Sequence, residues 1–140
     1  MTRLLVTAAL AALAGCGTAE APSGAEPAAH LVVREVLPLQ PRYIEGSLSY
    51  LRVEAVGGEA VVDGPATDGT QVRGRDPLLE RPLPAGEYRL VSHQRPCQGN
   101  CSFLDPPTDR CERTVRLEPG ATVTATVVLA QEGGCEVRLG

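Results

Sequence analysis

From about residue 114 to the C-terminus, apolar and polar residues alternate with a period of two. The clearest stretch is 122–129, where threonines alternate with valine, alanine and leucine, and the pattern recurs in 114–117 and 135–139. A period of two places the apolar side chains on one face of an extended strand. The turn formers Pro119-Gly120 and Gly133-Gly134 lie between these stretches. We therefore predict three strands, each with one buried and one solvated face.

Upstream of residue 114, shorter apolar runs recur about every eight to twelve positions, a spacing typical of all-β domains, with no sustained helical period. These runs predict further strands over residues 31–37, 48–56, 60–62, 71–73 and 88–95. We expect an all-β fold: a single antiparallel β-sandwich, Ig-like or related, of about seven to nine strands. It should span residues 30–140.

The first sixteen residues have the layout of an export signal. Arg3 supplies a positive charge, residues 4–14 are apolar and too short to span a bilayer, and Leu13-Ala14-Gly15-Cys16 closes the stretch. This pattern resembles the lipobox of bacterial lipoprotein signals. The resemblance implies removal of a signal peptide over residues 1–15, lipidation of Cys16, and attachment to the cell membrane on its extracytoplasmic face.

Residues 16–29, which follow the signal, consist mainly of Ala, Pro, Gly and Glu and contain no bulky apolar residue. Such a segment cannot bury enough apolar surface to offset the entropy of ordering. We expect a disordered tether that begins at the lipidated Cys16 and leads into the domain at His30.

Charge and aromatic content argue against some partners. The 140 residues carry a formal net charge of -4, with no lysine and no basic block, and include three Tyr, one Phe and no Trp. Nucleic-acid binding is disfavoured, because it calls for basic patches and stacking aromatics. The expected partners are the membrane, through the lipid on Cys16, and a protein or a small ligand.

The segment 83–90, Leu-Pro-Ala-Gly-Glu-Tyr-Arg-Leu, resembles the L-P-x-G-x-Y-x-L segment of transthyretin-like and carboxypeptidase-regulatory-like domains, and of related Ig-like modules. The resemblance implies that Gly86 turns the chain between sheets. It also implies that Tyr88 begins an inner strand and that Leu90 takes the next inward position. This supports a fold and not an activity.

Four cysteines follow Cys16, namely Cys97, Cys101, Cys111 and Cys135. An even number in an exported domain predicts two disulfides. We prefer the pairs Cys97–Cys135 and Cys101–Cys111, because an Ig-like sandwich would place its last strand antiparallel beside the strand that begins at Tyr88. The pairs Cys97–Cys111 and Cys101–Cys135 remain a close alternative.

Residues 98–110 form a long connection for a hairpin, and long loops often carry function. The candidate binding residues within it are Phe103, Leu104, Asp105, Asp109 and Arg110. One interpretation is a rigid, disulfide-braced recognition surface. The other is structural: the aspartates cap turns while Phe103 and Leu104 fill the end of the sandwich.

Metal and redox sites are weaker alternatives for the same region. Cys97, Cys101 and Cys111 could join His93 around a metal, but the spacing lacks the paired knuckles of zinc sites. A redox-active cysteine pair is also open. Calcium at Asp105 and Asp109 would have too few oxygen ligands. We expect no metal and no cofactor.

No catalytic residue is assigned. Ser92 and His93 are neighbours on a strand and should point to opposite faces, so they cannot act as nucleophile and base. We expect a lipoprotein that binds a partner without catalysis. The alternatives are a metal-handling or thiol-redox lipoprotein, and a small hydrolase built on Asp63, Asp68, Asp105 or Asp109.

Overall fold

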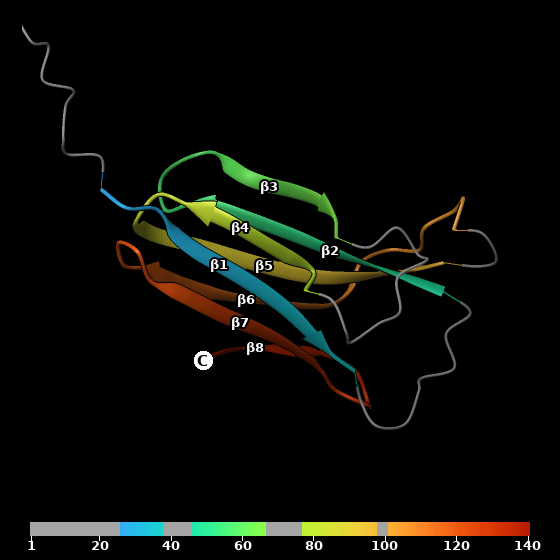
Figure 1. Cartoon of the computed structure of the whole chain (residues 1–140). Coiled ribbons are helices and arrows are strands. Elements are labelled where there is room, and N and C mark those ends of the chain that lie inside the picture. The colour runs from blue at the N-terminus through green and yellow to red at the C-terminus, as the bar shows by residue number, and fades with distance from the viewer. Residues whose placement is uncertain (1–25, 38–45, 67–76, 98–100) are drawn as a thin grey trace, which may run out of the picture.

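The computed structural model describes residues 26–37, 46–66, 77–97 and 101–140. The described chain contains eight strands in two four-stranded sheets and no helix, so the predicted all-β sandwich is confirmed (Figure 1). None of its described elements is a helix that could cross a membrane. The strands are β1 (Ala29–Val36), β2 (Gly46–Ala55), β3 (Ala60–Pro65), β4 (Leu79–Leu83), β5 (Gly86–Cys97), β6 (Thr108–Leu117), β7 (Thr122–Leu129) and β8 (Cys135–Leu139).

The two sheets have the strand orders β4-β1-β7-β8 and β3-β2-β5-β6. Five of the six pairings are antiparallel, but β1 and β7 pair in parallel, from His30 opposite Thr122 to Val36 opposite Val128. An immunoglobulin constant domain keeps its first two strands in one sheet, whereas here β1 and β2 lie in different sheets. The last strand, β8, pairs with β7 and not with β5, so the expectation that it lies beside the strand that begins at Tyr88 is wrong.

Most of the predicted strands are present, with three differences. Strand β4 was not predicted, because its short sequence contains Pro82, which only an edge strand tolerates. Strand β6 begins at Thr108, within the segment interpreted as a loop. Ala29, assigned to the tether, is fully buried at the start of β1. The strand predicted over 71–73 lies outside the described residues.

The core lies between the sheets, on the faces that the alternation predicts. Its fully buried side chains of largest volume are Leu31, Val33, Leu51, Val53, Leu90, Val115, Leu117 and Val127. Gly86 begins β5 directly after β4 of the other sheet, and Tyr88 is 4% exposed and donates a hydrogen bond to the carbonyl of Pro84 at 2.9 Å. These positions agree with the roles expected for residues 83–90.

The two ends of the sandwich differ. We call the end with the β2–β3, β4–β5 and β6–β7 connections the turn end, and the end with Val36, Gly46, Cys97, Thr108 and Cys135 the loop end. The chain enters β1 at the turn end, where the carbonyl of Pro27 accepts a hydrogen bond from the amide of Gly120 at 3.2 Å. Figure 1 shows β1 running from this end toward the loop end.

Candidate recognition surface at the loop end

All four domain cysteines form disulfides, as predicted, but the pairing is Cys97–Cys101 and Cys111–Cys135. Both pairings derived from the sequence are therefore wrong. The reason is topological: β8 lies in the other sheet from β5, which places Cys135 opposite Cys111 of the edge strand β6, with their Cα atoms 5.5 Å apart. Cys97 then closes locally onto Cys101, with a Cα–Cα distance of 4.9 Å.

Backbone and side-chain contacts fix the segment that follows Cys101. Leu104 forms a β-bridge with Cys97, and the amide of Asp105 donates to the carbonyl of Pro96 at 2.8 Å. The guanidinium of Arg95 donates to the carbonyl of Asp105 at 2.7 Å and to that of Leu104 at 3.1 Å. This brace, together with the disulfide, holds the segment against the end of β5.

Gly46 at the start of β2 lies against the Cys97–Cys101 disulfide. A Cβ atom at this position would lie 3.0 Å from Sγ of Cys97 and 3.2 Å from Sγ of Cys101. A side chain at this position would press on both sulfurs, so glycine favours the close approach of β2 to the disulfide.

The braced segment displays its aromatic residue instead of burying it. The side chain of Phe103 is 87% exposed, Asp105 is exposed, and Leu104 is half-buried. The interpretation that Phe103 fills the end of the sandwich is therefore wrong. An exposed ring on a rigid segment is the kind of side chain that anchors a partner.

Asp109 and Arg110 belong to β6 and not to a loop. The register shifts between Ser92 and Gln94 of β5, so Asp109 and Arg110 together lie opposite the single residue His93, which makes a β-bulge. Asp109 has a left-handed φ of 51°, and its carboxylate accepts a hydrogen bond from the amide of Gly134. Asp109 therefore holds β6 to the turn before β8, which is a structural role.

His93 points to the outer face of its sheet, where its ring stacks on Tyr50 of β2 with the centroids 5.1 Å apart. Burial lowers the pKa of His93, and the positive charges of Arg110 and Arg95 lower it further, while Asp63 opposes them. Ser92 is fully buried on the inner face. The prediction that Ser92 and His93 face opposite sides is confirmed.

A layer of buried polar side chains, which the sequence reasoning missed, lies inside the loop end. Gln94 donates to the carboxylate of Glu35 at 2.7 Å, Ser49 donates to the same oxygen at 2.8 Å, and Ser47 donates to Gln94 at 2.8 Å. These bonds join β1 of one sheet to β2 and β5 of the other. Ser47 and Ser49 lie on the same face of β2 as inward-facing Leu51, and Gln94 lies on the same face of β5 as inward-facing Leu90. The alternation alone could therefore have shown that these polar side chains face inward.

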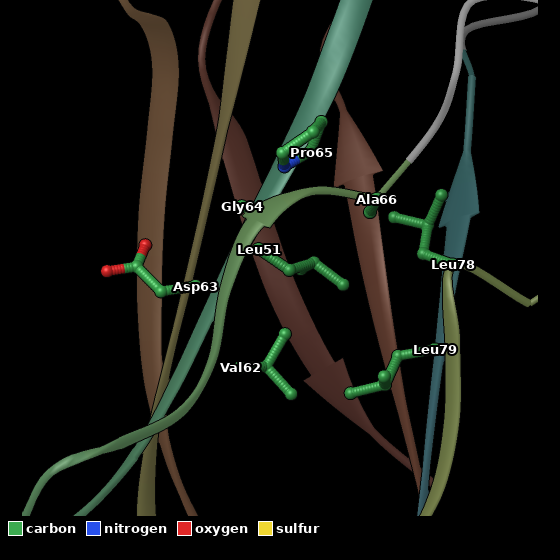
Figure 2. A pocket seen from close by; sticks show the side chains of 8 residues that line it. All are labelled: Leu51, Val62, Asp63, Gly64, Pro65, Ala66, Leu78 and Leu79. Carbon is green, nitrogen blue, oxygen red and sulfur yellow. The ribbon is translucent and has the colours of Figure 1, made fainter.

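A groove lies at the edge of the sandwich between β3 and β4. It has a volume of about 310 Å³, and its lining is mostly apolar. Figure 2 shows the side chains of Leu51, Val62 and Leu79 converging on it, while that of Asp63 points away.

Two carboxylates of the hydrolase alternative, Asp63 and Asp109, lie on opposite edge strands of one sheet. Asp63 lies on β3 and binds Arg52 at 2.8 Å, whereas Asp109 lies on β6, three strands away or roughly 14 Å at the usual strand spacing. Asp68 lies outside the described residues. Among the residues that the structure describes, no three His, Cys, Asp or Glu side chains gather into a possible metal site. The bridged sulfurs of Cys97, Cys101 and Cys111 are not thiolate ligands.

Comparisons of the chain with protein-family models, with curated proteins and with solved structures return no match.

Proposed function

We propose that this protein is a lipid-anchored binding module on the extracytoplasmic face of the cell membrane, and that it presents its loop end to a protein or small-ligand partner without catalysis. The single observation that carries the proposal is Phe103, which is 87% exposed on a segment braced by the Cys97–Cys101 disulfide and Arg95. An apolar ring held rigidly in water loses little conformational entropy when a partner covers it.

Two further observations support the membrane attachment. Residues 13–16 resemble a lipobox, and the two disulfides favour an oxidising compartment. Cys16 lies outside the described residues, and its lipidation stays a prediction. The chain enters the domain at the turn end, so a tether that leads back to Cys16 joins the domain at the end opposite Phe103.

The fold assignment within the β-sandwiches is part of the same proposal. Residues 83–90 match the L-P-x-G-x-Y-x-L segment of transthyretin-like and carboxypeptidase-regulatory-like domains, and Tyr88 and Leu90 occupy the inner positions that this match implies. We assign the domain to this group of sandwiches in preference to the immunoglobulin constant type, because β1 and β2 lie in different sheets.

Site-specific photo-crosslinking in the native cells tests the binding function. A photoreactive amino acid replaces Phe103 in the full chain, and the matched control carries it at Val56, an exposed residue (61%) of the turn end. We expect a discrete crosslinked product from position 103 and none from position 56. Equal products from both positions, or none from either, would argue against a recognition surface at Phe103. Membrane fractionation of Cys16→Ser tests the anchor, because loss of the thiol should release the protein or leave an uncut precursor.

Thiol–disulfide exchange is a second candidate, because the observed pairing closes Cys97 onto Cys101 at a separation of only four residues, with Cys101 half-exposed. An external dithiol would supply two electrons and two protons to this disulfide and would leave as its own disulfide. Alkylation and mass spectrometry across a series of dithiol-to-disulfide ratios test it. The candidate requires Cys97–Cys101 to reduce before Cys111–Cys135 and at a potential that physiological dithiols reach.

A further inference from the structure

The outer face of the sheet β3-β2-β5-β6 gathers hydrogen-bond donors near the loop end. They come from three adjacent strands, and they are Tyr50 of β2, His93 and Arg95 of β5, and Arg110 of β6. Tyr50 stacks on His93, and the charges of Arg95 and Arg110 both reach the imidazole. Three groups that are cationic or can become cationic therefore lie together on one surface.

The backbone on both sides of Arg110 is fixed. Arg110 lies between Asp109, which binds the amide of Gly134, and Cys111, which is bridged to Cys135. The bulge with its left-handed Asp109 sets Arg110 opposite His93. Bulges often redirect a side chain beside a binding site, and a non-glycine residue at positive φ costs about 1 kcal/mol or more.

Four carboxylates lie near this positive charge, and two of them have other surroundings: Asp109 binds the amide of Gly134, and Asp105 is exposed to solvent beside Arg95. Asp63 of β3 is held by Arg52 at 2.8 Å, and Glu112 of β6 lies 3.6 Å from Arg110, a long and exposed contact. Arg95 uses Nε and Nη2 for the loop carbonyls, which leaves Nη1 as a donor. Like charges placed side by side are unfavourable, and a bound anion would relieve the repulsion.

We propose that Tyr50, His93, Arg95 and Arg110 bind an oxyanion: a sulfate, phosphate or carboxylate group, free in solution or carried by a larger molecule. Arg110 and Arg95 supply charge-assisted hydrogen bonds, His93 donates once protonated, and the Tyr50 hydroxyl adds a neutral donor. The site depends neither on the lipid anchor nor on Phe103. Because only protonated His93 donates to the anion in this arrangement, anion binding is coupled to the uptake of a proton by His93.

The histidines of the full-length protein, purified in a non-ionic detergent, report on the site by NMR titration. The chain has two of them, and His30, exposed near the start of β1, is an internal reference. Sulfate serves as the probe because it keeps its charge across the titration, and chloride holds the ionic strength constant. We expect sulfate to raise the pKa of His93 by about half a unit or more, roughly a threefold change in proton affinity, and to leave the His30 titration curve in place.

Two arginine variants of β6 separate a site from a general effect of salt. Arg110→Gln should raise the pKa of His93 without sulfate, because a positive charge is removed, and should abolish the response to sulfate. Arg116→Gln is the matched control: Arg116 lies on the same face, toward the turn end, and pairs with Glu118. It should respond to sulfate as the unaltered protein does.

Three outcomes would overturn the proposal: no response of His93, the same response in Arg110→Gln, or an equal response of His30. Micelles doped with phosphatidylglycerol distinguish the sources of the anion. A shift of the His93 pKa with the doped micelles assigns the site to lipid headgroups. A shift with sulfate alone assigns it to an anion in solution or on a partner.

Discussion

The edge of the sandwich between β6 and β8 is covalently closed, whereas the edge between β3 and β4 is left as an apolar groove. At the first edge the Cys111–Cys135 disulfide joins the two sheets, and Asp109 binds the amide of Gly134. At the second edge Arg81 of β4 reaches the carbonyl of Val61 of β3 at 2.8 Å, and half-buried Val62 and Leu79 line the groove.

The difference shows how a small domain with few aromatic residues distributes its stability. A short chain buries a limited core, and a crosslink can replace packing at one edge. The closed edge lies beside Arg110 and the loop end, where a binding surface needs fixed geometry. The groove edge has no such bond among the described residues, and we expect it to be the more easily opened of the two.

The largest effect should come from removing the closing disulfide. The unfolding free energy of the Cys111→Ala/Cys135→Ala variant should be about 3 to 4 kcal/mol lower, because this bond closes a long loop, with a sequence separation of 24. Removing Cys97 and Cys101 in the same way should cost about 2 kcal/mol, because their separation is only 4. Denaturant unfolding without reductant measures both. Equal losses of unfolding free energy would show that the length of the closed loop does not decide how much each disulfide stabilises the fold.

A pair of valine truncations compares packing at the two edges with the same chemical change. Val137→Ala of β8 removes a side chain that is 3% exposed and should cost about 2 kcal/mol. Val62→Ala of β3 should cost about 1 kcal/mol or less, because its side chain already borders the groove. If Val62→Ala proved as costly as Val137→Ala, the groove would be as tightly packed as the core.

The contact of Asp109 with Gly134 should contribute less to the unfolding free energy than the Cys111–Cys135 disulfide. Asp109→Ala should lose about 1 to 2 kcal/mol, because the amide of Gly134 loses its acceptor and alanine tolerates the left-handed φ poorly. Asp105→Ala is the control and should change stability by less than about 0.5 kcal/mol, because its side chain is exposed. The same unfolding assay measures both variants.

The smallest change in the unfolding free energy is expected on acidification. The folded protein lowers the pKa of His93, so the unfolded chain binds the proton more tightly. Stability should therefore be fully present above the unfolded pKa of about 6.5 and should decline as the pH falls through that value toward the folded pKa. His93→Gln should flatten this part of the pH profile. Because His93 faces Arg110, the protection factors for amide hydrogen exchange should fall on acidification in β6 more than in β3.

The local pattern of the sequence predicted much of the fold. The period of two identified the end of β6, β7 and β8 and the inward positions of Val115 and Val127, because alternation depends only on strand geometry. The spacing of apolar runs identified β2 and β5, and the resemblance of residues 83–90 implied the inward position of Leu90. These patterns missed β4, whose five residues pair as an edge strand although they contain a proline. They also assigned Asp109 and Arg110 to a loop, because a charged edge strand has no apolar alternation.

The candidate site was only partly predictable. The sequence identified Phe103 and the long connection around it, and the structure adds the exposure of the ring and its brace through Arg95. The roles of Tyr50, His93 and Arg110 depend on the register of three strands, and no local pattern specifies a register with a bulge.

The sequence by itself determined that the domain is all-β, that its four cysteines are bridged, and which side chains of the regular strands face inward. These features follow from alternation and from the number of cysteines, which are local properties or simple counts. Only the tertiary structure decided that β8 pairs with β7, that Cys111 meets Cys135, and that β1 and β7 run in parallel. Strand pairing depends on how the two sheets share one core, and contacts between residues distant in the chain decide it.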